Sequence, residues 1–209
     1  GTLRDCTSLT EVILHGAVTH IGQEAFKDAT SLTSIQLPMN LVSIGTAAFQ
    51  GCTNLAQIHI PNGVSVLSDS VFEDCINLSE ITLPSNLTTI GEDAFNNCRM
   101  LTDFYIPETV ASIGARAFMN CTSLQSLTFL GNAPAIGQWA LANNTMIAYY
   151  PYNDDTWTGD VMQMYGARRL HWIPMGSAYK AAVYSADTNL GMYTTVTEAL
   201  AARQENQYV

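Results

Sequence analysis

Residues 78–121 read LSEITLPSNLTTIGEDAFNNCRMLTDFYIPETVASIGARAFMNC, a stretch that states one pattern almost twice. In both halves an apolar triplet, a proline, an I-G pair, an A-F pair and a cysteine recur with a spacing of 23 residues. The same spacing separates six leucines in a row, Leu9, Leu32, Leu55, Leu78, Leu101 and Leu124. A fixed period of this length is typical of a solenoid built from one repeated unit.

The other apolar residues of this part of the chain keep the same period and form further columns. Two columns come from the segment after each leucine: Val12, Ile35, Ile58, Ile81, Phe104 and Leu127, then Leu14, Leu37, Ile60, Leu83, Ile106 and Phe129. An aromatic column holds Phe26, Phe49, Phe72, Phe95 and Phe118, and Leu141 continues it. No single copy can bury its own apolar face, so we expect stacked copies to share one continuous core.

Each copy also predicts its own local structure. Alternation from Ile35 to Leu37 indicates a strand, which Pro38 ends because proline cannot donate to a ladder. Residues 42–44 predict a second short extended stretch, and Gly45 then marks a turn. We expect a short turn of helix or 3₁₀ structure around Ala48 and Phe49.

The blocks LPSNLTTIGEDAFNNC (residues 83–98) and IPETVASIGARAFMNC (residues 106–121) resemble the BspA-like leucine-rich repeats of bacterial surface proteins. The resemblance covers residues 5–146. It implies a β-rich leucine-rich-repeat solenoid with short strands, short helical or 3₁₀ turns and a C-terminal cap. It also implies secretion or display on a bacterial cell surface, adhesion or protein binding, and no enzymatic activity.

The period divides the chain into three parts. Residues 1–146 form the solenoid, with six full copies from Leu9 and a partial copy before them, so we expect the natural protein to begin upstream of Gly1. Residues 147–176 predict a C-terminal cap. Residues 177–209 are an extension or the start of a following domain.

Within the cap, residues 146–151 and 168–174 predict strands, and residues 156–165 predict a helix after the N-cap chemistry of residues 153–155. The blocks TWTGDVMQMYG and HWIP resemble the segment that closes this repeat family, with Trp157 and Trp172 covering the last copy. The alternative is a calcium loop formed by the acidic and amide side chains of 153–160, although the spacing lacks the alternating oxygens and the central glycine of such loops. Beyond the cap, residues 182–184 predict a strand and residues 199–203 a helix.

The cysteines follow the repeat rather than a disulfide framework. Cys52, Cys75, Cys98 and Cys121 occupy one column, and Cys6 has the same phase. Side chains stacked in parallel copies point the same way, a geometry that suits buried thiols better than a disulfide or a converging metal site. We therefore expect free thiols, no metal and no cofactor, with a disulfide or a metal as the alternative.

The net charge and the absence of known motifs argue against several classes of partner and of activity. The net charge of -10 argues against nucleic acid and anionic lipid as partners. No apolar run approaches the length of a membrane span, so we expect no membrane insertion by this chain. The four histidines have no carboxylate or cysteine partner in the repeat register, and no catalytic motif is present, so we expect no enzyme.

The outward face of the strands remains as the candidate site. Between the inward apolar residues, two columns face out, beginning with Glu11 and Ile13. The expected contact residues are Ser34, Gln36, Gln57, His59, Glu80, Thr82, Asp103, Tyr105, Ser126 and Thr128. We interpret the chain as a binding or adhesion module that recognises a protein or glycan along this face; the alternative for the face is mere solvation. The rival function is an accessory or spacer domain of a larger secreted enzyme, which the full-length reading frame would decide.

Overall fold

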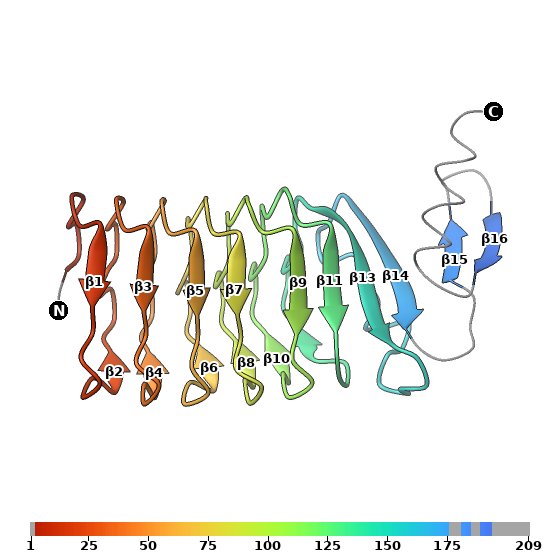
Figure 1. Cartoon of the computed structure of the whole chain (residues 1–209). Helices are drawn as coiled ribbons and strands as arrows, with labels where there is room; N and C mark the ends of the chain where they lie inside the picture. The colour runs from red at the N-terminus through yellow and green to blue at the C-terminus, as the bar shows by residue number, and fades with distance from the viewer. Residues whose placement is uncertain (1–2, 176–180, 185–188, 194–209) are drawn as a thin grey trace.

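The computed structural model describes residues 3–175, 181–184 and 189–193, and most of them form a parallel β-solenoid (Figure 1). We call each turn of the solenoid a rung. A row of longer strands comprises β1 (Glu11–Ile13), β3 (Ser34–Gln36), β5 (Gln57–His59), β7 (Glu80–Thr82), β9 (Asp103–Ile106), β11 (Ser126–Phe129), β13 (Thr145–Pro151) and β14 (Arg169–Met175). A second row comprises β2 (His20–Ile21), β4 (Ser43–Ile44), β6 (Val66–Leu67), β8 (Thr89–Ile90), β10 (Ser112–Ile113) and β12 (Ala135–Ile136).

The pairing of the strands follows the repeat. All strands from β1 to β14 pair in parallel, and Val12 lies opposite Ile35 just as Phe104 lies opposite Leu127. The longer row forms two sheets, β1-β3-β5-β7 and β9-β11-β13-β14. Beyond them, β15 (Ala181–Tyr184) and β16 (Asn189–Tyr193) form an antiparallel hairpin, which confirms the strand predicted over residues 182–184. The predicted helix over residues 199–203 lies outside the described residues.

The core is the set of inward columns. Phe26, Phe49, Phe72, Phe95 and Phe118 are buried, and neighbouring rings stack with centroids 5.2–5.6 Å apart and interplanar angles of 11–17°. This distance is close to the spacing of paired strands, so the ladder itself sets the stacking. Leu141 is also buried and continues the column.

The segment around Ala48 and Phe49 is a series of turns, and the expected helical or 3₁₀ turn is wrong. Ala47, like its equivalent in the other copies, has a left-handed backbone with φ of 54°. The N–H groups of Ala47 and Phe49 donate to the next rung, at Asp69 O (2.9 Å) and Val71 O (3.0 Å), whereas Ala48 N–H donates back to Gly45 O (3.2 Å). A helix would use every N–H within the segment. Here alternate donors bind the neighbouring rung, so the turns are part of the ladder.

The cysteine column is built as a ladder of buried thiols. In the structure Cys52, Cys75, Cys98 and Cys121 are free and buried, and Cys6 is free and half-buried. Each buried Sγ lies 3.1 Å from a phenylalanine carbonyl oxygen, to which its S–H donates. Asn144 takes the next place in the column and donates from Nδ2 to Phe118 O at 2.6 Å. Burial raises the pKa of Cys52 and of Cys121 to about 12.

The described part of the predicted cap, residues 147–175, extends the ladder by two strands, as expected from the sequence, but it contains no helix. Trp157 N–H donates to Asp154 O (3.2 Å) and Val161 N–H to Thr158 O (3.0 Å), which are isolated turns. The chain has positive φ at Tyr165 (43°) and Gly166 (79°), and the carbonyls of both accept N–H groups from the preceding rung. The segment 156–165 therefore forms another rung turn, and at its end the carbonyl of Tyr165 accepts from the preceding rung.

An aromatic cluster closes the core at this end. Trp157 is buried and packs edge-on against Phe129 with ring centroids 4.7 Å apart. Trp172 lies 5.6 Å from Trp157 and 5.8 Å from Phe129, and Tyr150 lies 5.5 Å from Trp157. The Trp157 indole donates to Gly131 O at 3.1 Å. The two tryptophans thus cover the last full copy of the repeat.

Candidate partner-binding face

The outward side of the longer strand row is the strand face. The strands alternate between exposed and buried residues, as in Ser34–Gln36 and Gln57–His59. Among the ten expected contact residues, eight are exposed: Ser34, Gln36, Gln57, His59, Glu80, Thr82, Asp103 and Tyr105. Tyr105 stands out, with 62% of its surface exposed. Parallel pairing therefore presents these side chains in two straight columns.

Two expected contact residues are less accessible than the repeat suggested. Ser126 is half-buried, and Thr128 is buried with 8% exposure. Thr128 lies between Tyr105 on one neighbouring strand and Tyr149 on the other. Because two large side chains flank a short one, Thr128 contributes little to the surface. The expectation that Thr128 is an open contact residue is wrong for this reason.

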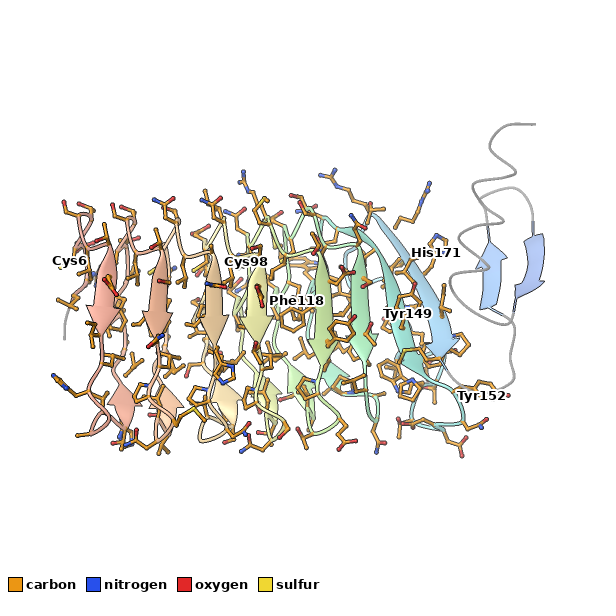
Figure 2. All side chains as sticks on the ribbon, viewed as in Figure 1. Cys6, Cys98, Phe118, Tyr149, Tyr152 and His171 are labelled. Carbon is orange, nitrogen blue, oxygen red and sulfur yellow. The ribbon has the colours of Figure 1, made fainter. Side chains whose placement is uncertain are left out.

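The structure also adds residues to the strand face that the repeat analysis missed. The register places Ile147 and His171 in line with Ser126, and Tyr149 and Ile173 in line with Thr128. Figure 2 labels Tyr149 on β13 and His171 on β14. The spacing changes here, because Tyr149 follows Thr128 by 21 residues. The early proline of MIAYYP, at Pro151, was the sequence signal that could have located the shifted strand.

Three carboxylates of the strand face have no positive partner within the part of the chain that the structure describes. Glu11, Glu80 and Asp103 belong to one outward column, and none of them forms an ion pair with any residue that the structure describes. Ser126 Oγ donates to Asp103 Oδ1 at 2.5 Å and holds that carboxylate in place. Burial, with the charge of Asp103 adding to it, raises the pKa of Tyr149.

The ion pairs of the described residues lie on the turns. Arg116 binds Asp93 at 2.7 Å and also contacts Glu92, while Arg4 binds Glu24 at 2.5 Å. Glu24, Glu92, Asp93 and Arg116 follow strands of the second row and Arg4 precedes β1, so these groups are separate from the strand face. Glu11, Glu80 and Asp103 are therefore left without an intramolecular ion pair among the described residues.

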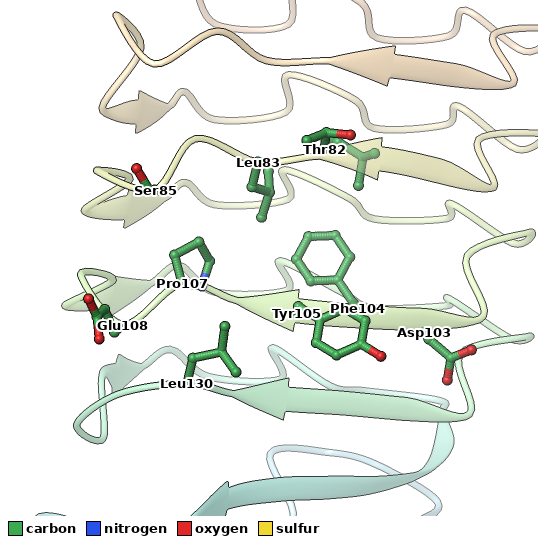
Figure 3. A pocket seen from close by; sticks show the side chains of 10 residues that line it. Thr82, Leu83, Ser85, Asp103, Phe104, Tyr105, Pro107, Glu108 and Leu130 are labelled. Carbon is green, nitrogen blue, oxygen red and sulfur yellow. The ribbon is translucent and has the colours of Figure 1, made fainter.

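A depression of about 480 Å³ lies on the strand face between the fourth and sixth rungs. Its walls come from β7, β9 and the turns that follow β7, β9 and β11, and they include Leu83, Tyr105, Pro107 and Leu130 (Figure 3). Leu130 is 50% exposed, although the position holds proline in four earlier copies. The depression thus combines open apolar surface with the exposed ring of Tyr105.

The structure offers no arrangement for a metal among the residues it describes, where no group of three histidine, cysteine, aspartate or glutamate side chains converges. In the segment considered for calcium, Asp154 Oδ1 accepts hydrogen bonds from Thr156 N (2.9 Å) and Thr156 Oγ1 (2.5 Å), which stabilise a turn. Within the same described residues, no helix is long and apolar enough to span a membrane.

Comparison with solved structures gives similar solenoids from bacteria. A leucine-rich repeat protein from T. pallidum is 29% identical with a TM-score of 0.58, over 63% of this chain and 75% of that one. A leucine-rich repeat protein from Bacteroides ovatus is 22% identical with a TM-score of 0.53, over 81% of this chain and 56% of that one. The pneumococcal vaccine antigen PcpA is 20% identical with a TM-score of 0.50, over 67% of this chain and 40% of that one. The last two likenesses concern the fold alone.

A search of curated proteins finds no match. The model of the BspA type leucine rich repeat region, in contrast, matches six copies over residues 1–125 and 88–156. These ranges include the columns, the thiol ladder and most of the strand face described above. The chain therefore belongs to the BspA-type leucine-rich repeat family.

Proposed function

We propose that this chain is a non-enzymatic binding module of a secreted or cell-surface bacterial protein, and that its strand face carries the contact with a protein or glycan partner. The observation that carries the proposal is the contrast between the two sides of each strand. Inward positions hold similar apolar residues in every rung, whereas outward positions change from rung to rung, as in Gln36, His59, Thr82 and Tyr105.

The rigidity of the ladder supports the same function. Within each of the two sheets the outward side chains stand on paired strands, and β9, which carries Tyr105, is paired with β11, so little backbone order has to be gained on binding. Tyr105 offers ring area and a hydroxyl group, a combination frequent among residues that dominate binding energy. Membership of the BspA-type leucine-rich repeat family supports the proposed place outside the cell, because the resemblance to that family implies secretion or surface display.

The test is a binding screen of the purified chain against purified extracellular proteins and a glycan array, followed by affinity measurements on variants. Tyr105→Ala and His59→Ala should each weaken binding by about 1–3 kcal/mol if they are anchors. Both side chains are exposed, so the free energy of unfolding should change by less than about 0.5 kcal/mol.

Trp139→Ala provides the matched control. Trp139 is also a half-exposed aromatic residue (52%), but it lies in the turn after β12 and not on the strand face. Its removal should leave affinity unchanged. Equal losses for Trp139→Ala and Tyr105→Ala, or no loss for either strand-face variant, would assign the contact to another surface.

A further inference from the structure

The depression beside Tyr105 carries a carboxylate at each end and apolar walls between them, a pattern that favours one chemical class of partner. Asp103 lies at one end and Glu108 at the other, with Tyr105 and Pro107 between them (Figure 3). β9 carries Asp103 and ends at Ile106, and Glu108 lies in the turn that follows, so the Cα atoms of the two acids are separated by at most roughly 16 Å. The middle of the depression is apolar, with Leu83, Pro107 and Leu130 as its walls.

Both carboxylates lack a positive partner among the described residues of this chain. Each of them is exposed, and Asp103 is held in position by the hydroxyl of Ser126. A neutral ligand that covered the depression would desolvate these carboxylates without compensating their charge, which is costly. A ligand that brings two positive charges would pair both carboxylates and extend its apolar parts over the space between them.

We propose that this depression binds an extended basic peptide segment of a protein partner, in which an apolar residue lies between two arginine or lysine residues about four positions apart. The spacing follows from the distance between Asp103 and Glu108, because four residues of an extended peptide span roughly 13 Å and the basic side chains reach further. The apolar residue packs against Tyr105 and Leu130. A guanidinium at Asp103 also lies within reach of the Tyr105 ring, where a cation is attracted to the aromatic face.

This inference rests on the proposed function, because it names the partner class for the same strand face. The probe is the peptide acetyl-Arg-Thr-Leu-Thr-Arg-amide, with its citrulline counterpart as a neutral match of nearly the same shape. Each is titrated into the ¹⁵N-labelled chain, and backbone amide shifts report both the location and the dissociation constant. The arginine peptide should bind about tenfold or more tightly than the citrulline peptide, with the largest shifts on β7, β9 and the turn after β11. Raising the salt concentration should weaken the binding of the arginine peptide.

Three single variants distinguish pairing with the two acids of the depression from attraction to the negative charge of the whole chain. Asp103→Asn and Glu108→Gln should each lower the affinity for the arginine peptide about three- to tenfold. Glu11→Gln is the matched control, because Glu11 is an exposed acid in the same column as Asp103 but lies on the first rung. It should leave the affinity unchanged, and melting curves should coincide for all three variants.

Equal affinities for the arginine and citrulline peptides, no binding of either, or equal losses for Glu11→Gln would overturn the inference. Other results would contradict the proposed function itself rather than this inference. If a neutral glycan or an uncharged protein surface binds the chain and is lost in Tyr105→Ala, the strand face remains the binding site and only the basic peptide is wrong. If no ligand of the screen responds to Tyr105→Ala or His59→Ala, the proposed function itself is wrong.

Discussion

At the scale of single residues, the buried cysteines show how one position is used in every rung. Each thiol fills a small apolar site and donates to a carbonyl 26 residues earlier in the chain. Asn144 takes the same position at the end of the column and makes the same donation, but its Oδ1 is buried without a partner. Thiols suit this column because they bury one weak donor and leave no strong acceptor unpaired.

The buried thiols make stability depend on alkaline pH. Burial raises the pKa of Cys121 from its ordinary value near 9 to about 12 in the folded chain, because the apolar surroundings disfavour the thiolate. A folded pKa above the unfolded one means that stability is full below pH 9 and is lost as pH rises from about 9 to 12. Each such thiol contributes a slope of about 1.4 kcal/mol per pH unit in this window.

We expect Cys121→Ala to reduce the slope of the free energy of unfolding against pH by about the contribution of one thiol. The measurement is urea unfolding between pH 8 and 11 under reducing conditions. Val71→Ala is the control, since it removes buried volume without removing a titrating group. It should lower stability at every pH and leave the slope as it was. An unchanged slope in Cys121→Ala would mean that the thiol ionises as readily in the folded chain as in the unfolded one.

At the scale of elements, the glycine of the I-G pair lies against the backbone of the preceding rung in four copies, at Gly45, Gly91, Gly114 and Gly137. The sequence indicates a turn there, but the backbone of Gly114 needs no positive φ. A Cβ added at Gly114 would instead lie 2.4 Å from Glu92 N and 2.6 Å from Gly91 C in the preceding rung. Ser68 holds the same place in the third copy, where its hydroxyl donates to Ile44 O at 2.6 Å.

Gly114→Ala should therefore destabilise the chain by about 1–3 kcal/mol, because backbone rather than a flexible side chain has to move. Gly22→Ala is the matched control at the same position of the first copy, where an added Cβ meets nothing within 4 Å. Its effect should stay within about 0.5 kcal/mol. The measurement is urea unfolding of both variants, and equal effects would show that the rungs separate easily enough to admit a methyl group.

At the scale of the whole molecule, the solenoid has to be closed at its end. The core columns reach Leu127 and Phe129, which are buried because β13, β14 and the two tryptophans follow them. Without those residues, β11 would be an open strand edge beside an uncovered core, and such edges promote aggregation.

We expect a chain ended after residue 144 to aggregate or to lose cooperative unfolding, as measured by light scattering and thermal melting. A chain ended after residue 175 retains both strands and both tryptophans, and it should remain monomeric with a cooperative transition. If the shorter chain were equally soluble and melted at the same temperature, residues 147–176 would not close the core.

Much of this architecture was predictable from the sequence by itself: the period, the inward columns, the aromatic stack, the thiol column and the outward position of residues such as His59 and Tyr105. These features depend on a constant spacing and on the alternation of sides along a strand, both of which are local properties. Tertiary structure alone decided the left-handed turns at positions such as Ala47, the absence of a helix over residues 156–165 and the shifted register that adds Tyr149 to the strand face and buries Thr128. The reason is that hydrogen bonds between rungs determine these features, and the partners of those bonds lie about one full repeat away in the chain.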